Sequence, residues 1–348
     1  MMGNNKREKW ISRCVSILVL LVLLLSAAVS ACSESAAPDD PVPEEASETL
    51  SGAYPMPAPA GSAAPGLDAD GFLDADEPYI YADRDAGEWT YLSRNIHIEI
   101  RQEKEVSKKG SQVWLIAAIR YREPAWFGAM VNDSTKENSK KNKTFLSKPL
   151  TIYKNNEAVF AISDDFFGSR LLDKKKAGIV IRNGKIWSES TQPGNGKKWP
   201  ALDVLAQFAD GTWKTFESDA HTAQEYLDMG VVSTYAFGPI LVENGQVSED
   251  MKNWKDTEKA PRLALGIAVD GTLVAVDALG RRKDSTGVTV ARMASKMVEL
   301  GVKDAFNLDG GNTTCMIFMG DMINHTLKVS NESIRSVNSL IGIRETTP

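Results

Sequence analysis

Residues 260–280 read APRLALGIAVDGTLVAVDALG, which is two apolar runs separated by Asp270-Gly271. An Asp-Gly pair tolerates the positive φ angles that a two-residue β-hairpin turn requires. The same kind of turn stands between apolar runs at three further places, Asn183-Gly184, Asp210-Gly211 and Asn244-Gly245. The sequence therefore predicts several antiparallel hairpins.

Further strands and a few helices are expected around these hairpins. Residues 96–100 alternate between apolar and polar side chains, as in a half-buried strand, and residues 113–119 form a more deeply buried apolar run. Thr289 is placed to cap a helix that ends at Gly301, and a second helix is expected over about 221–229. Because strands and helices do not alternate regularly, we expect a single α+β domain with mixed, largely antiparallel sheets and a few packed helices.

The composition is that of an ordinary globular protein, and the charge is unevenly distributed. The 348 residues are 43% hydrophobic and 25% charged, which excludes a fibre or wholesale disorder. The formal charge of −6 combines +3 in residues 1–31, −13 in residues 33–88 and +4 in residues 89–348. So small and scattered a positive charge in the folded part, without a zinc-finger or RNA-binding motif, indicates no nucleic-acid partner.

The first 32 residues have the pattern of a targeting segment. A basic stretch is followed by the apolar run 15–29, and Val29-Ser30-Ala31-Cys32 resembles a bacterial lipobox. We expect residues 1–31 to be a signal peptide and Cys32 to carry the lipid that anchors the protein in the bacterial cell membrane, facing outside the cytoplasm. The alternative is an uncleaved anchor helix, although the uncharged stretch is shorter than the ~20 residues that span a bilayer.

Residues 32–88 are expected to form a disordered, acidic tether, with the folded domain over 89–348. This segment holds eight of the fifteen prolines and shows little apolar periodicity. Residues 68–77 superficially resemble a calcium loop, but nothing after them completes the twelve-residue pattern. A solvated acidic linker is therefore the favoured interpretation.

Several common catalytic signatures are missing from the sequence. It contains no phosphate-binding Gly-x-x-x-x-Gly-Lys loop, no dinucleotide fingerprint, no His-Glu-x-x-His and no Gly-x-Ser-x-Gly. The three histidines lie far apart in the chain, which disfavours a histidine metal centre. The residues that remain for chemistry are carboxylates, arginines and glycines, and no cofactor is expected.

The densest group of such residues is the stretch DAFNLDGGNTTCM at 304–316. An apolar strand runs into Asp309, and Gly310-Gly311 follow, where the backbone could approach a ligand closely. An acid at the end of a buried strand is costly unless it is paired or used. The two interpretations are a functional site and a structural turn in which Asp309 caps local amides.

Asn307-Leu308-Asp309-Gly310-Gly311 resembles the signature of the phosphodiester glycosidase domain family. Further segments resemble the family in the family's own order: 161–168 (AISDDFFG), 237–242 (FGPILV), 260–266 (APRLALG), 276–281 (VDALGR) and 285–289 (STGVT). The sequence departs from the family pattern within these motifs. Ser163-Asp164 stands where the family usually has Asn-Gly, three residues separate Asp277 from Arg281 instead of one, Leu263 replaces a threonine, and Asn312-Thr313-Thr314 replaces a Gly/Gln-Ser-Ser run.

The resemblance implies hydrolysis of the glycosidic bond of a sugar-1-phosphodiester, which releases free sugar and a phosphomonoester. Asp309 is the first candidate for the carboxylate at the anomeric carbon, Asp165 the second and Asp277 the third, with an arginine pairing as the alternative for Asp277. Candidate phosphate clamps are Arg262, Arg281 and Arg335, because a guanidinium matches two phosphate oxygens. The remaining candidates for substrate binding are Asn307, Gly310, Gly311, Asn312 and Thr313.

Two other functions remain open: a glycan-binding or wall-polymer-binding lipoprotein that has lost turnover, and an ordinary glycosidase whose leaving group is a sugar alcohol. The arginines favour a sugar-1-phosphodiester over an ordinary glycoside as the substrate, whereas the altered Asn-Gly segment is the main support for a binding protein. Cys315 is expected to be a buried packing residue and not a nucleophile, because nothing in the sequence places a histidine beside it. Either arginine of the pair Arg262 and Arg281 could instead bind a structural aspartate.

Overall fold

The computed structural model describes residues 66–107, 110–132, 146–172, 178–190, 202–252, 254, 257–325 and 334–345. The expected signal peptide, Cys32 and the expected tether up to residue 65 lie outside these ranges. Within them, no helix has the length and apolar character needed to cross a membrane.

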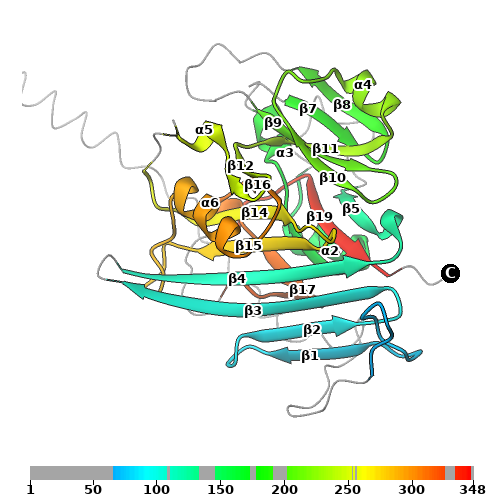
Figure 1. Ribbon diagram of the computed structural model, residues 1–348, viewed down its shortest axis with the longest axis vertical. Helices are drawn as coiled ribbons and strands as arrows, with labels where there is room; N and C mark the ends of the chain where they lie inside the picture. The colour runs from blue at the N-terminus through cyan, green and yellow to red at the C-terminus, as the bar shows by residue number, and fades with distance from the viewer. Residues whose placement is uncertain are drawn as a thin grey trace, which may run out of the picture. The chain divides into compact units, whose positions relative to one another are not determined.

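The largest element is a nine-stranded antiparallel sheet (Figure 1). Its hairpin β14–β15 is the one quoted above, and β16 lies beside β14, so that Asp277, Leu263 and Leu308 share one row across three strands. In spatial order its strands are β1 (Tyr79–Asp83), β2 (Glu88–Leu92), β3 (Ile96–Ser107), β4 (Gly110–Tyr121), β15 (Leu273–Leu279), β14 (Arg262–Ile267), β16 (Asp304–Leu308), β12 (Ile240–Glu243) and β13 (Gln246–Val247).

Two five-stranded antiparallel sheets complete the β-structure. The second sheet is ordered β10 (Trp213–Phe216), β9 (Asp203–Phe208), β11 (Val231–Phe237), β7 (Gly178–Arg182) and β8 (Lys185–Ser190). The third is ordered β18 (Asp321–Met322), β17 (Met316–Phe318), β6 (Ala158–Ser163), β19 (Ser339–Arg344) and β5 (Phe127–Val131). The chain passes from β16 of the first sheet directly to β17 of the third, through the segment that contains Asp309.

A hydrophobic core joins the three sheets, and short helices cover their other faces. Leu265 and Phe306 of the first sheet pack with Leu205 of the second and Phe160 of the third. The helix α6 packs on the opposite face of β14 and β15 (Figure 1), while α2 covers the third sheet and α4 the second. The helices are α2 (Pro149–Asn155), α3 (Phe167–Leu172), α4 (Ala223–Asp228), α5 (Glu249–Lys252) and α6 (Val290–Glu299), with 3-10 turns at Pro124–Trp126 and Gly311–Thr313.

This architecture confirms the predicted α+β fold with antiparallel sheets and few helices. All four predicted turns connect hairpins, and both residues of Asn183-Gly184 have positive φ, at 49° and 75°. The side chain of Thr289 caps α6 by accepting a hydrogen bond from the amide of Arg292, and the helix ends before Gly301 at φ 72°.

The predicted start of the folded domain at Trp89 is too late. Residues 66–88 contain β1, which pairs in register with β2, and Leu73 and Ile80 are buried. The acidic segment that superficially resembled a calcium loop is a turn: Asp68 accepts hydrogen bonds from the amides of its own loop, and Arg122 forms ion pairs with Asp68 and Asp70. Its negative charge is thus partly neutralised by a distant arginine.

Candidate active site

Two acid-bearing strand ends meet where the first and third sheets join. Asp164 directly follows the last residue of β6, and Asp309 directly follows the last residue of β16. The amide of Asp309 donates to the carbonyl oxygen of Asp164 at 3.0 Å. Gly310 packs closely on the neighbouring backbone, because a Cβ there would lie 2.5 Å from the carbonyl oxygen of Pro261. Gly311 has a φ of 67°, in the left-handed region that favours glycine.

The Asp309 carboxyl group lies in the protein interior. It is 8% exposed, and its Oδ2 atom accepts no hydrogen bond from any residue that the structure describes. Burial raises its pKa to about 7; the charge of Asp164 also raises the pKa, whereas the Thr313 hydroxyl and the charges of Arg335 and Arg170 lower it. A carboxyl group that titrates near neutral pH is suited to proton transfer.

Two further buried acids have raised pKa values. Burial and the charge of Asp165 raise the pKa of Asp164 to about 6, against the effects of Arg182 and Ser339. Burial raises the pKa of Asp277 to about 7, although the amide of Asn324 donates to its Oδ2 atom at 2.8 Å. Since Asp277 lies on β15, two strands from β16, its backbone is about 10 Å from that of Leu308 at ~4.8 Å per strand.

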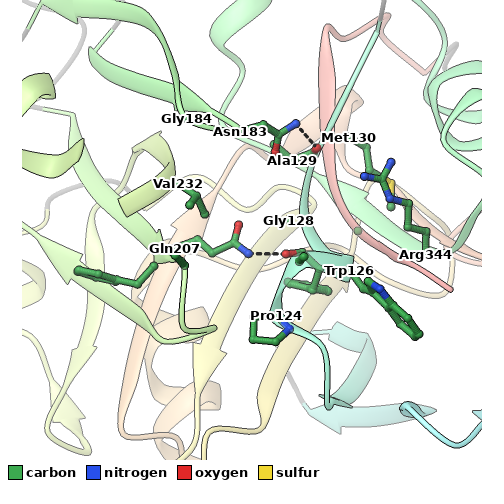
Figure 2. Close-up of a pocket in the computed structure, with 15 residues that line it drawn as sticks. Pro124, Trp126, Gly128, Ala129, Met130, Asn183, Gly184, Gln207, Val232 and Arg344 are labelled. Carbon is green, nitrogen blue, oxygen red and sulfur yellow. Dashed lines mark hydrogen bonds between the residues drawn. The ribbon is translucent and has the colours of Figure 1, made fainter. Parts of the chain in front are cut away.

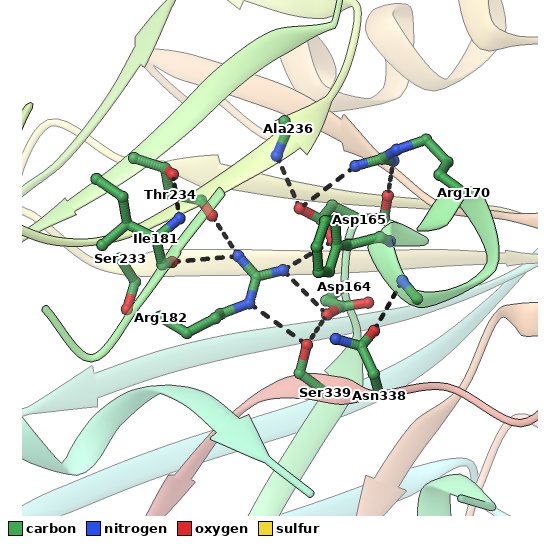
Figure 3. A network of polar contacts seen from close by, with 12 residues as sticks. Asp164, Asp165, Arg170, Ile181, Arg182, Ser233, Thr234, Ala236, Asn338 and Ser339 are labelled. Carbon is green, nitrogen blue, oxygen red and sulfur yellow. Dashed lines mark hydrogen bonds and ion pairs between the residues drawn. The ribbon is translucent and has the colours of Figure 1, made fainter. Parts of the chain in front are cut away.

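Asp165, the second predicted catalytic acid, belongs to a buried ion-pair network that ties the second and third sheets together (Figure 3). Its carboxylate accepts hydrogen bonds from Arg182 at 2.8 Å, from the amide of Ala236 at 2.8 Å and from the amide of Phe167 at 3.1 Å. Arg170 lies 3.9 Å from it. Both carboxylate oxygens of Asp165 thus accept hydrogen bonds from the protein, which indicates that Asp165 holds the surrounding segments together.

Arg182 is the cation that holds this network. It is fully buried, bridges Asp165 and Asp164, and also donates to Ser339 and to the carbonyl oxygen of Thr234 (Figure 3). Ser339 in turn donates to Asp164. The Asp164 side chain is thereby fixed in position, and its carbonyl oxygen accepts the hydrogen bond from the amide of Asp309.

Two exposed arginines, one of them over a half-buried aromatic ring, bind the loop that follows Asp309. The guanidinium of Arg335 lies 5.1 Å from the centre of the Phe166 ring, and the Arg335 amide donates to the Asn312 carbonyl at 3.0 Å. Arg281 donates to the side-chain oxygen of Asn312. Two cations therefore converge on the loop that follows Asp309.

The structure brings together Asp309, Gly310, Gly311, Asn312, Thr313, Arg281 and Arg335 from the predicted set. It directs Arg262 elsewhere: its guanidinium donates to the carbonyl oxygens of Glu258 and Val288. Asn307 is 2% exposed and donates to the carbonyl oxygen of Gly238, which joins β16 to the start of β12. Cys315 is buried, and burial together with the charges of Asp277 and Asp164 raises the pKa of its thiol, as expected of a packing residue.

Sequence reasoning missed Asp164, Arg170, Arg182 and Ser339. The signal for Arg182 is an arginine that directly ends the apolar run 178–181, where a buried cation needs a buried acid. For Asp164 the only signal is its position at the end of an apolar strand, which Asp165 shares. Among the described residues, no group of three or more histidine, cysteine or acidic side chains is arranged to hold a metal ion.

Comparison with known proteins agrees with this fold and these motifs. The model of the phosphodiester glycosidase family matches residues 156–344, more than half of the chain. The SPbeta prophage-derived uncharacterized protein YomE of Bacillus subtilis (strain 168) is 31% identical over 150 residues, which are 42% of this chain and 23% of that protein. The chain thus aligns with less than a quarter of that relative.

Among solved structures, the chain resembles the catalytic domain of zebrafish N-acetylglucosamine-1-phosphodiester alpha-N-acetylglucosaminidase auto-inhibited by its pro-peptide. The TM-score is 0.57 at 15% identity, over 73% of this chain and 85% of that one. A hypothetical protein from Synechocystis matches with a TM-score of 0.46 at 14% identity, over 78% and 64% of the two chains. The first of these likenesses agrees with the fold, and the family match shows that the chain belongs to the phosphodiester glycosidase family.

Proposed function

We propose that the protein hydrolyses the glycosidic bond of a sugar-1-phosphodiester, with Asp309 as the acid–base group at the anomeric carbon. The observation that supports this best is the environment of Asp309: a nearly buried carboxyl group, with one oxygen lacking a hydrogen bond from the described residues. The charge of the exposed Arg335 acts on it, and the exposed Arg281 binds the loop that follows it. A membrane-anchored member of the family acting on wall polymer, capsule or scavenged glycan fits the sequence.

In this reaction the bond between C1 of the sugar and the phosphate oxygen breaks, and its electron pair leaves with the phosphate. Water supplies the new C1 hydroxyl group, and its other proton goes first to Asp309. A pKa of about 7 favours Asp309 as the base, because a base works best when its pKa lies near the working pH. The leaving phosphate ester needs little protonation, since its second ionisation lies near pKa ~6.

Arg335 and Arg281 are the proposed phosphate clamps. Both are exposed, and the charge of Arg335 acts on Asp309 directly. Phe166, over which Arg335 lies, is the proposed platform for the sugar ring. Arg262 moves from first to last among the predicted clamps, because it donates to backbone carbonyl groups.

Asp164 and Asp165 have different proposed roles although they are neighbours in sequence. The carbonyl oxygen of Asp164 accepts a hydrogen bond from the amide of Asp309, and its charge raises the pKa of the Asp309 carboxyl group. Asp164 therefore positions the base and adjusts its pKa. Asp165 anchors the loop through Arg182 and the amides of Ala236 and Phe167. The retaining or inverting outcome depends on the distance between the carboxyl groups that act on the sugar.

We also propose that Cys32 is lipidated and that the domain lies outside the cytoplasm, on the basis of the lipobox-like residues 29–32. In a bacterial host, Cys32→Ala should abolish incorporation of labelled lipid and normal cleavage of the signal peptide. Incorporation at the wild-type level would show that this lipid anchor is wrong.

The experiment for the activity incubates purified full-length protein with a panel of sugar-1-phosphodiesters and measures free sugar and phosphomonoester. We expect equimolar release of both, and a loss of 10²- to 10⁴-fold in rate for Asp309→Asn, the usual range for one acid–base group. The alternative function is a glycan-binding protein without turnover, favoured by the Ser163-Asp164 departure and by the deep burial of all three acids. Binding of the same compounds without any release of sugar would support that alternative.

A further inference from the structure

A groove of about 490 Å³ lies between the third sheet and the second, at the free edge of β5. Trp126, Phe208 and the backbone of β5 line it, together with the side chains of Gln207, Asn183 and Arg344 (Figure 2). Its volume lies in the range of ~300–1,000 Å³ that is typical of small-ligand sites. Its combination of aromatic surface with a few polar groups is also typical of such sites.

The groove is separate from the candidate active site. Arg344 and Ser339 stand at opposite ends of β19, and Ser339 donates to Asp164. Five residues of strand separate them by about 17 Å, at ~3.3 to 3.4 Å per residue. A ligand in the groove therefore does not need to touch Asp309.

The edge of β5 is closed against the addition of another strand. Gln207 donates to the carbonyl oxygen of Phe127, and Asn183 donates to that of Ala129 at 3.2 Å, both from the second sheet (Figure 2). An extended peptide would have to displace these amides in order to pair with the edge. This arrangement favours a compact ligand over a peptide strand.

The polar groups of the groove select for the kind of compact ligand. Arg344 is exposed and has no ion-pair partner within the described part of the chain, and no carboxylate from that part lines the groove. Asn183 is also exposed, and its amide has four hydrogen-bonding positions, of which the contact with Ala129 uses one. A half-buried indole, an amide and an unpaired guanidinium together suit a sugar ring that carries hydroxyl groups and a nearby anionic group.

We propose that this groove is a second carbohydrate-binding site, which stacks a sugar ring on Trp126 and binds its hydroxyl groups through Asn183 and an adjacent carboxylate or phosphate through Arg344. The site is distinct from that of the proposed hydrolysis. Binding is measured without turnover, so its outcome does not depend on whether the protein is an enzyme.

Isothermal titration of full-length protein tests this with two probes, a tetrasaccharide of alternating glucuronate and N-acetylglucosamine and the neutral N-acetylchitotetraose. We expect the anionic probe to bind, Trp126→Ala to weaken it at least tenfold, and Trp126→Phe to restore most of the affinity. Arg344→Gln should weaken the anionic probe several-fold and leave binding of the neutral probe unchanged. Tyr81→Ala, which removes a half-buried aromatic ring on β1, is the matched control and should bind like the wild type.

Three results would overturn the proposal. The first is that neither tetrasaccharide binds at millimolar concentration. The second is that binding survives both Trp126→Ala and Arg344→Gln, which places the sugar elsewhere. The third is that an alternating threonine–valine hexapeptide binds and is lost with Trp126→Ala, which makes the groove a strand-docking surface.

Discussion

Replacing Asp309 by asparagine should stabilise the protein at alkaline pH relative to acidic pH. Burial raises the pKa of Asp309 from 3.8 to about 7. Below pH 3.8 the group is protonated in both the folded and the unfolded chain, so it has no effect on folding. As the pH rises from 3.8 to 7, only the unfolded chain loses the proton readily, and the free energy of unfolding falls. The full penalty is present above pH 7.

The size of the effect follows from these two pKa values. A shift of about three units corresponds to roughly 4 kcal/mol when the pH lies well above 7, at ~1.36 kcal/mol per unit. Between pH 5 and pH 8 the penalty in the wild type grows by about 2 to 3 kcal/mol. Asparagine does not titrate, so its own cost of burial is the same at both pH values and cancels in this comparison.

Urea unfolding of both proteins at pH 5 and pH 8 measures this difference. The stability of Asp309→Asn relative to the wild type should rise by about 2 to 3 kcal/mol between the two pH values. A comparison variant is Asp165→Asn, which leaves Arg182 buried without its full set of partners and should destabilise by about 3 to 5 kcal/mol at pH 5, where Asp309→Asn has its smaller effect. An Asp309→Asn effect that is equal at pH 5 and pH 8 would refute the buried, neutral-range carboxyl group.

Three further predictions concern the clamp, the positioning acid and the domain boundary. Arg335→Gln should slow hydrolysis of a sugar-1-phosphodiester more than that of an aryl glycoside, whereas Arg262→Gln should change the two rates by the same factor. Steady-state kinetics on the two substrates measures this, and the reversed pattern would show that Arg262 is the clamp. Asp164→Asn removes a charge that raises the pKa of Asp309, so the acid limb of the pH–rate curve should move to lower pH. An acid limb at the wild-type pH would contradict the effect of Asp164 on the pKa of Asp309. Deleting residues 66–85 should lower the thermal midpoint by several degrees, because it removes β1 and the buried Leu73; an unchanged midpoint means that β1 adds little.

The hairpins and the helix caps could be predicted because their causes are local. Asn183-Gly184 forms a turn wherever apolar strands flank it, and Thr289 caps a helix through an amide only three residues away. That residues 66–88 belong to the folded domain could not be predicted in this way. Ile80 is buried because β1 pairs with β2 at the edge of a nine-stranded sheet, whereas the local composition is acidic.

In the candidate site, too, the features with local causes could be predicted and those that depend on distant residues could not. Asp309 and its glycines could be selected as candidates from the sequence, because an acid and two glycines follow an apolar run in a stretch that resembles the family signature. The choice between Asp164 and Asp165 could not be made, because Arg182 contacts both and the difference lies in which carboxylate accepts the amide of Ala236, a partner 71 residues away from Asp165. Arg262 shows the opposite case, in which a family motif is present but its guanidinium binds backbone carbonyl groups.

The most direct test of the proposed activity is hydrolysis of a sugar-1-phosphodiester in water enriched in ¹⁸O, with mass spectrometry of both products. Attack at the anomeric carbon puts the heavy oxygen into the sugar and none into the phosphomonoester, and the Asp309→Asn protein should form almost no labelled sugar. Heavy oxygen in the phosphate product, or labelled sugar formed by Asp309→Asn at the wild-type rate, would contradict the assignment of a glycosidase that uses Asp309.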